Sequence, residues 1–309
     1  MKKTLLPVAG LLLLLGTAIN SAAAHYGSAA NYAEDRPVTA LQADSNPEQT
    51  VQTVSPNPAK QTIIICGSGD SQNLLRHLAA SYEQSHPDVS IDVQDSIGSS
   101  GGIKATAAGK CDLGRVARPL KEQEKALNLS YLLFADSPVV FLVNSSVTGV
   151  TSITGQQAAG IFSGAITRWS ELGGPPEKIY VANREKGDSS RTIIEKHIPA
   201  FNGIDKPVGQ ILYTTPENIA AINRYKYTIG YSCLAEAENQ PNIVVLQLDQ
   251  LSPNRENVTQ GAYRLVIPLG LVWKDEPGRQ VKNFIDFLYS PAAEKIMADH
   301  GAFSALKRR

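Results

Sequence analysis

The stretch from Asp95 to Lys104 is the feature that most constrains the fold. It reads Asp-Ser-Ile-Gly-Ser-Ser-Gly-Gly-Ile-Lys, after the strand-like run Val89 to Val93 and into an Ala-rich, helix-compatible segment, Ile103 to Ala108. A turn of this kind presents backbone N–H groups, serine hydroxyls and the positive end of a helix dipole to one point. We therefore predict an oxyanion-binding turn between a strand and a helix.

Two more stretches have the same construction, Gly67 to Ser71 and Gly187 to Arg191. An oxyanion that loses its water needs many donors, and short serine-rich turns supply them with little net charge. Arg184 and Arg191 could add bidentate, charge-assisted hydrogen bonds, unless Arg191 faces solvent. A single Gly–Ser turn often only caps a helix, but three of them favour one shared anion site. The candidate hydroxyl donors are Ser68, Ser71, Ser99, Ser100, Ser189 and Ser190.

Short apolar runs alternate with helical periodicity from Thr62 onwards, which predicts an α/β fold with a parallel sheet. Leu74, Leu75, Leu78, Ala79 and Tyr82 recur at helical spacing, for example. We predict two lobes: residues 61–144 and 262–309 form the first, and 145–261 form an inserted second. Two chain crossings then make a hinge, with the ligand in the cleft between the lobes. Further strands are expected at 137–143, 179–181, 229–231, 243–248 and 263–273, and further helices at 154–162, 191–198, 216–223, 280–289 and 291–300.

The N-terminus has the pattern of a secretory signal peptide. Lys2 and Lys3 form a basic region, Leu5 to Leu15 is apolar, and Ala22 to Ala24 offers a cleavage site. We predict a signal peptide over 1–24, the alternative being an uncleaved anchor. Residues 25–60 are polar and are predicted to be a disordered linker. The mature protein is expected to be periplasmic or otherwise exported, soluble and monomeric.

The charge balance and the scattered positions of the histidines limit the classes of function that are possible. The chain of 309 residues has 29 basic and 29 acidic side chains, which argues against nucleic-acid binding. None of the five histidines falls in a metal-type spacing, so we expect no metal, no cofactor and no catalytic residue. Gly98 to Gly102 matches the G-x-S-x-G pattern of a nucleophile elbow, which we interpret as chance. An exported phosphatase and a scaffold protein remain as alternatives.

The three cysteines, Cys66, Cys111 and Cys233, are expected to be small apolar packing residues. Cys66 ends one predicted strand and Cys111 begins the next. If these strands are parallel neighbours, the two cysteines lie at opposite ends of the sheet and cannot form a disulfide.

Several motifs resemble those of the phosphate-binding proteins of ABC-type phosphate uptake, the PstS-like family. The resemblance extends over nearly all of residues 61–304, and it implies a two-lobe, type II periplasmic-binding-protein fold that closes on dehydrated phosphate. The motifs that carry it are Gly98 to Lys104, Ala108 to Gly114, Arg118 to Lys121, Ile161 to Trp169 and Arg184 to Arg191.

Carried over by position, the resemblance implies a phosphate site built from three loops. The implied residues are Asp70, Ser71 and Gln72 on the first loop, Ser99, Ser100 and Gly101 on the second, and Arg184, Asp188, Ser189 and Ser190 on the third. Arg115, Ala117, Arg118 and Arg191 are further candidates.

Two positions depart from the family pattern. Ala117 stands where the family usually has a polar or acidic side chain facing the ligand, and Asp188 replaces the usual serine after Gly187. We hypothesise that Asp188 or Asp70 takes over the acceptor role, the alternative being that Asp188 only caps a helix. Arg115 would add charge at the cleft or form an ion pair between the lobes.

The resemblance therefore implies a binding protein that captures phosphate, or a similar tetrahedral oxyanion, for a membrane ABC transporter permease. Alternatives are a different oxyanion or a phosphonate-like ligand, or a role as a sensor.

Overall fold

The computed structural model of the chain describes residues 60–274 and 276–305, which all belong to one compact unit, Pro56–Arg309. The predicted signal peptide and, apart from Lys60, the predicted linker lie outside the described residues. Within the described residues, no helix combines the length and apolar character that a membrane crossing requires.

The first lobe has the β-α-β-α-β order that the sequence predicts. β1 pairs in parallel with both β2 and β3, and α1 packs on β2. The predicted apolar face of α1 is buried, from Leu74 to Tyr82. Its elements are β1 (Gln61–Gly67), the 3-10 turn η1 (Gly69–Ser71), α1 (Gln72–Ser85), β2 (Val89–Ser96), α2 (Gly98–Ala107), β3 (Leu113–Val116), α3 (Glu122–Lys125), α10 (Arg279–Phe287), α11 (Pro291–Asp299) and β12 (Phe303–Ser304).

The second lobe is a smaller mixed sheet with helices around it. β6 pairs in parallel with β7 and β8, and an aromatic cluster of Phe141, Phe162, Phe201 and Tyr231 fills its core. Its elements are β5 (Ser152–Ile153), α4 (Gly155–Ser163), the 3-10 turn η2 (Trp169–Leu172), β6 (Tyr180–Arg184), α5 (Ser189–His197), α6 (Pro199–Asn202), β7 (Gln210–Leu212), α7 (Thr215–Arg224), β8 (Thr228–Cys233), α8 (Leu234–Ala237), β9 (Ile243–Val245), β10 (Gln247–Leu248) and α9 (Arg255–Thr259).

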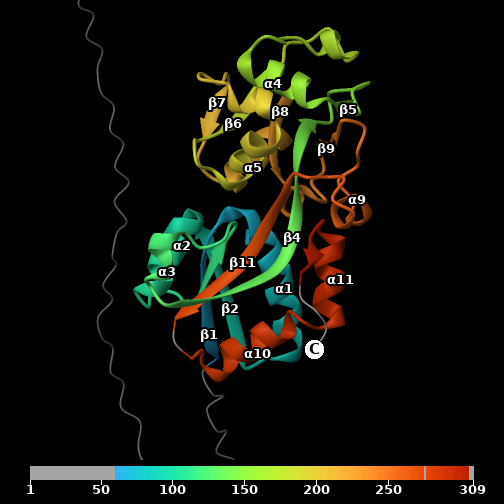
Figure 1. Cartoon of the computed structure of the whole chain (residues 1–309). Helices are drawn as coiled ribbons and strands as arrows, with labels where there is room; N and C mark the ends of the chain where they lie inside the picture. The colour runs from blue at the N-terminus through green and yellow to red at the C-terminus, as the bar shows by residue number, and fades with distance from the viewer. Residues whose placement is uncertain (1–59, 275, 306–309) are drawn as a thin grey trace, which may run out of the picture. The chain divides into compact units, whose positions relative to one another are not determined.

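Two long strands, β4 (Leu129–Asn144) and β11 (Val266–Lys274), connect the lobes (Figure 1). The strand order is β2-β1-β3-β11-β4-β8-β6-β7, so one curled sheet continues from lobe to lobe. The first part of β4 pairs with β11, and Val139 to Val143 pair with β8. The α/β class, the two lobes and the two crossings between them are confirmed. The residue boundaries of the lobes stay a prediction.

Some predicted elements differ from the observed ones in extent. The strand expected at 137–143 is the end of the much longer β4, and the strand expected at 243–248 divides into β9 and β10. β7 and α8 were not predicted, because runs of three and four residues are too short to show periodicity.

The prediction that Cys66 and Cys111 cannot pair was wrong, because they form a disulfide with a Cα–Cα distance of 6.2 Å. The prediction assumed that β1 and β3 lie in register. In the structure β3 is staggered along β1, with Leu113 beside Ile65, so the start of β3 lies next to the end of β1. Cys233 is the free, buried cysteine among the described residues, as predicted.

Candidate functional site

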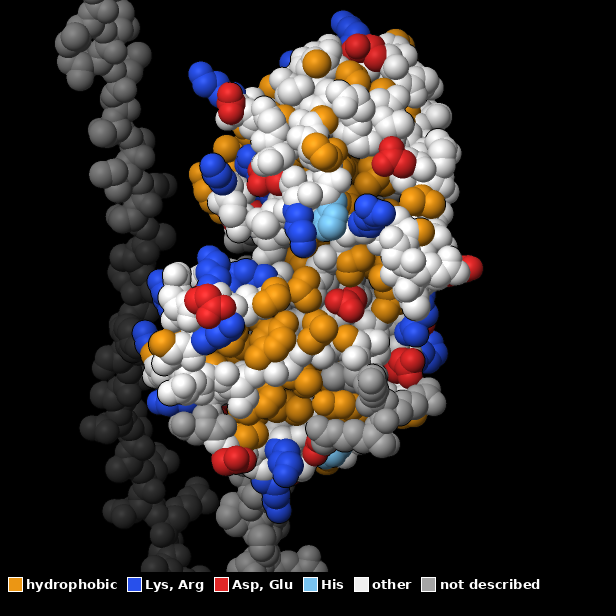
Figure 2. All heavy atoms as spheres, viewed as in Figure 1, with side chains coloured by type: hydrophobic (Ala, Val, Ile, Leu, Met, Phe, Trp, Pro, Cys, Tyr) orange, Lys and Arg blue, Asp and Glu red, His pale blue; other side chains and the backbone are white. Residues whose placement is uncertain are grey.

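The three predicted loops meet around a cavity of about 180 Å³ between the lobes. Lys and Arg side chains gather over α2 and α3, at the end of the first lobe that faces the second (Figure 2). The predicted residues that line the cavity are Ser68, Asp70, Ser99, Ser100, Arg118, Arg184, Asp188 and Ser189.

The first loop brings the buried carboxylate of Asp70 to the cavity. Asp70 lies in η1, directly after β1, and its Oδ2 accepts a hydrogen bond from Ser68 Oγ at 3.1 Å. Its Oδ1 accepts one from Thr215 Oγ1 at 3.0 Å, and Thr215 begins α7 in the second lobe. This hydrogen bond thus joins the first loop to the second lobe across the cavity. Ser71 and Gln72 are buried at the start of α1 and do not line the cavity.

The second loop is itself the first turn of α2, which begins at Gly98 and not at Ile103 as predicted. Gly98 has φ +71, so it reverses the chain after β2 without steric cost. Glycine at 101 and 102 lowers helix propensity, but close packing on the sheet overrides it. A Cβ on Gly102 would stand 2.7 Å from Gly67 Cα.

The serines of this turn are held by the segment that follows β3. Ser99 Oγ accepts from the Ala117 backbone N–H at 3.0 Å, and Ser100 Oγ accepts from Arg118 Nη2 at 2.9 Å. Ala117 therefore contributes through its backbone, although it has no polar side chain. Gly101 does not line the cavity.

The third loop carries an ion pair. Arg184 ends β6, and its Nη2 lies 2.9 Å from Asp188 Oδ2. Asp188 Oδ1 accepts from the Arg191 backbone N–H at 2.9 Å, so Asp188 is the N-cap of α5. Asp188 thus caps the helix, as the alternative interpretation expects, but the same side chain also lines the cavity, so capping is not its only contact.

Burial and the neighbouring charges shift the pKa values of both partners of this pair. It raises the pKa of Asp188 to about 7, with Asp70 adding to the effect and Arg184 opposing it. Burial lowers the pKa of Arg184, but the carboxylates of Asp188, Asp70 and Glu185 outweigh it, so this pKa is raised overall. The cavity thus holds a charged guanidinium beside a carboxyl that is protonated more easily than an ordinary aspartate.

Three further candidate residues, Arg115, Arg191 and Ser190, lie away from the cavity lining. Arg115 is 0% exposed and does not line the cavity, and its Nη2 donates to Gln94 O at 2.7 Å, so it adds no charge to the cleft wall. Among the described residues it forms no ion pair within 4 Å. Burial lowers its pKa to about 10, although the charge of Glu236 in the second lobe opposes this effect. Arg191 is buried too, with Nη1 donating to Arg184 O at 2.9 Å, so the solvent-facing alternative is wrong. Ser190 is buried in α5 beside it.

Sequence reasoning missed Thr215, Tyr213 and Lys121 as cavity residues. Thr215 follows β7 and starts α7, which is the same strand–turn–helix construction as the predicted loops. The signal was therefore present, but β7 is too short to recognise. Lys121 lies in a motif that resembles the family, although its role was not predicted.

Comparison with known proteins identifies the family. The family model of the PBP superfamily domain matches residues 52–292. The chain belongs to this superfamily.

Relatives within the PBP superfamily confirm the resemblance to PstS-like proteins. The phosphate-binding protein PstS of Bacillus subtilis (strain 168) is 27% identical over 247 residues, which are 79% of this chain and 80% of the relative. PstS of Borreliella burgdorferi is 24% identical, over 78% of this chain and 89% of the relative. A solved structure from Clostridium perfringens, described as a phosphate ABC transporter substrate-binding protein with bound phosphate, has a TM-score of 0.69 and 27% identity. The match covers 80% of this chain and 100% of that one.

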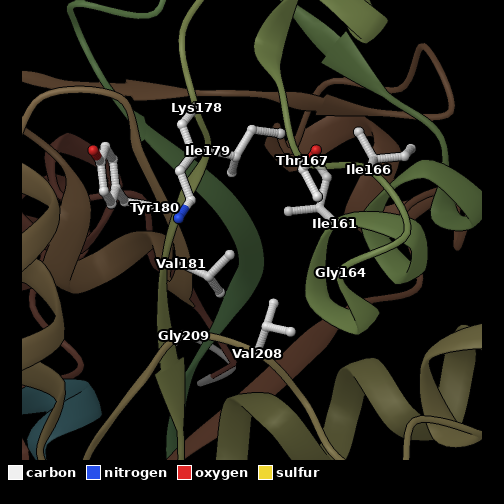
Figure 3. A pocket seen from close by; sticks show the side chains of 10 residues that line it. All are labelled: Ile161, Gly164, Ile166, Thr167, Lys178, Ile179, Tyr180, Val181, Val208 and Gly209. Carbon is white, nitrogen blue, oxygen red and sulfur yellow. The ribbon is translucent and has the colours of Figure 1, made fainter.

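A second cavity, of about 310 Å³, lies within the second lobe of this PBP-superfamily protein (Figure 3). Ile161, Val181 and Val208 point into it, and Lys178 is the charged side chain among its lining residues. It lacks the serines and the two arginines of the first cavity, so the first cavity is the better candidate for an anion. Within the described residues, no group of three or more metal-binding side chains is arranged to hold a metal ion.

Proposed function

We propose that this protein binds inorganic phosphate in the cavity between its lobes and delivers it to a membrane ABC transporter. The observation that carries this proposal is the convergence of three separate loops, from both lobes, on one small polar cavity. Helix N-termini and serine hydroxyls there suit a small oxyanion. The relatives named as phosphate-binding proteins support phosphate as this anion.

The proposal is tested with a ligand panel read by thermal shift and titration calorimetry, using phosphate, sulfate, molybdate and methylphosphonate. A ligand at about 100 times its Kd adds roughly 2.7 kcal/mol of stability. We expect phosphate to give the largest shift, with one site per chain. A shift by sulfate alone, or by none of these anions, would contradict the proposal.

We further propose that the Asp188 carboxyl accepts a hydrogen bond from a protonated phosphate oxygen. Asp188 lines the cavity, and a carboxylate there repels fully ionised sulfate. The substitution Asp188→Asn should weaken phosphate binding and narrow the preference for phosphate over sulfate. Equal selectivity of the variant and the wild type, measured by calorimetry, would refute this role.

A phosphonate-like ligand is the second candidate, and the rim of the cavity favours it. Ile97 and Tyr213 line the cavity from opposite lobes with 54% and 69% of their surfaces exposed. Such apolar side chains would contact an organic substituent on the anion. Tighter binding of methylphosphonate than of phosphate in the panel would establish this ligand.

The partner and the location follow from the same proposal. We propose that the protein is an exported monomer, that its lobes divide near residues 144 and 262, and that it turns over no substrate. Chromogenic phosphate esters should remain uncleaved while phosphate is bound stoichiometrically. Measurable ester hydrolysis would instead favour the exported phosphatase.

A further inference from the structure

Three side chains form a continuous hydrogen-bonded connection across the cavity. Arg184 Nη1 donates to Thr215 Oγ1 at 3.1 Å, and Thr215 Oγ1 donates to Asp70 Oδ1 at 3.0 Å. All three are buried and all three line the cavity. Arg184 and Thr215 belong to the second lobe and Asp70 to the first, so this connection holds the two lobes together beside the candidate ligand site.

The direction of these hydrogen bonds is fixed by chemistry. A guanidinium only donates, so the Thr215 hydroxyl must accept from Arg184. The single hydroxyl proton is then available for Asp70. One threonine hydroxyl therefore orients a cation and a carboxylate of the cavity at the same time.

The backbone around Asp70 is shaped for this contact. A Cβ on Gly69 would stand 3.0 Å from Thr215 Cβ and 3.1 Å from Pro216 Cδ, which is tighter than ordinary van der Waals contact. Glycine at position 69 thus lets the first loop lie directly on the start of α7. α7 is a ten-residue helix with a Thr214 capping box, so Thr215 sits on a well-formed terminus.

We propose that Thr215 is a positioning residue that holds the two lobes closed around the ligand through its contacts with Gly69 and Asp70. We call this set of contacts the latch. This inference rests on the proposed phosphate function. The latch lengthens the lifetime of the closed, ligand-bound state. It also orients the Asp70 carboxylate so that its remaining lone pairs face the cavity.

The test compares Thr215→Val with Thr215→Ser in stopped-flow and calorimetric phosphate binding. Valine keeps the shape but removes the acceptor of Arg184 Nη1 and the hydroxyl donor to Asp70 Oδ1, so we expect phosphate affinity to fall about 10- to 100-fold. The loss should lie mainly in faster release. Serine keeps the hydroxyl and should restore most of the affinity. Gly69→Ala should also speed release, because its Cβ pushes the loop away from α7.

A matched control removes a threonine hydroxyl elsewhere in the second lobe. Thr154 Oγ1 accepts from the Gln157 backbone N–H at 3.1 Å and does not line the cavity, so Thr154→Val should lower stability but leave phosphate release unchanged. Wild-type release rates in Thr215→Val, or failure of Thr215→Ser to restore affinity, would overturn the latch.

A second measurement needs no ligand and separates the latch from the proposed function. In a double-mutant cycle on unfolding free energy, Asp70→Ala and Thr215→Val should be non-additive, because each variant removes the hydrogen bond from Thr215 Oγ1 to Asp70 Oδ1. Additive effects would overturn the latch. A wild-type protein that binds no phosphate would overturn the proposed function, and the cycle alone would then decide whether Thr215 joins the lobes.

Discussion

At the scale of single residues, Glu236 is a buried carboxyl outside the cavity that supports the first loop. It lies in α8, and its Oε1 accepts from the Asn73 backbone N–H at 2.9 Å, at the start of α1. Burial raises its pKa to about 8, with the nearby Asp70 adding to the effect. The folded protein therefore favours the protonated form of Glu236.

This shift predicts that part of the stability is lost at alkaline pH. The folded-state pKa lies above the ordinary 4.5, so the stabilising contribution is complete below about pH 4.5 and is lost as the pH rises towards 8. Glu236→Gln keeps an acceptor oxygen and cannot ionise. Its unfolding free energy should exceed that of the wild type at pH 8 by about a few kcal/mol, and match it near or below about pH 4. The exposed Glu238→Gln is the control, and parallel pH profiles of Glu236→Gln and the wild type would contradict the assignment.

Lys121 lines the cavity and is a second single residue whose role can be tested by substitution. Arg118 pairs with Glu124 at 2.7 Å and Arg184 pairs with Asp188, whereas no carboxylate of residues 60–274 or 276–305 forms an ion pair with Lys121. An exposed, unpaired cation at a cavity attracts an anion over several ångströms.

Lys121→Ala should therefore slow phosphate association several-fold at low ionic strength, and the difference should shrink in about 0.5 M salt. Stopped-flow association rates measure this effect. Lys125→Ala, which breaks an exposed pair with Glu122 on the same helix, is the control and should bind at the wild-type rate. A salt-independent loss in Lys121→Ala would point to a structural role.

The residues that the sequence could assign are those whose role depends on local chain geometry. Ser99 and Asp188 stand at helix starts after strands, and both line the cavity. Arg115 and Thr215 depend on contacts between distant segments, such as Arg115 with Gln94 and Thr215 with Asp70. No periodicity or spacing in one sequence records such contacts, so Arg115 was misplaced and Thr215 was missed.

At the scale of elements, the position of α2 is set by how closely its first turn approaches the sheet. A Cβ on Gly102 would meet Gly67 Cα, Arg115 O at 3.0 Å and Cys66 O at 3.1 Å. These are backbone atoms of β1 and β3, which cannot move aside without disturbing the sheet. The helical start of α2 was thus not predictable from its glycine-rich sequence alone.

Gly102→Ala should therefore lower the unfolding free energy by roughly 1–3 kcal/mol, because α2 must move away from the sheet. The same shift moves Ser99 and Ser100, so phosphate affinity should fall as well. Gly101→Ala meets only the exposed Ile97 side chain and should change stability by less than about 1 kcal/mol. Urea unfolding of both variants compares them, and equal stabilities would refute this account of α2.

At the scale of the whole molecule, the Cys66–Cys111 disulfide encloses both loops of the first lobe that line the cavity. The cysteines are 45 residues apart, and the segment between them holds η1, α1, β2 and α2. A crosslink of this span stabilises a fold mainly by restricting the unfolded chain.

Replacing both cysteines by serine should lower the unfolding free energy by roughly 2–4 kcal/mol. A reducing agent should lower the Tm of the wild type and leave the Tm of the doubly substituted variant unchanged. An unchanged wild-type Tm after complete reduction, verified by thiol titration, would contradict this role.

The continuity of β4 has a mechanical consequence. Its sixteen residues pair first with β11 and then with β8, without a loop between the two ladders. The lobes are therefore joined by a continuous strand and not by a loop, so a change in the angle between them would bend or twist β4. Because the lobes can separate without breaking backbone hydrogen bonds between strands, the energy needed to separate them depends on the side chains that meet across the cavity. Removing the Thr215 hydroxyl alone would therefore lower the energy needed to move the two lobes apart.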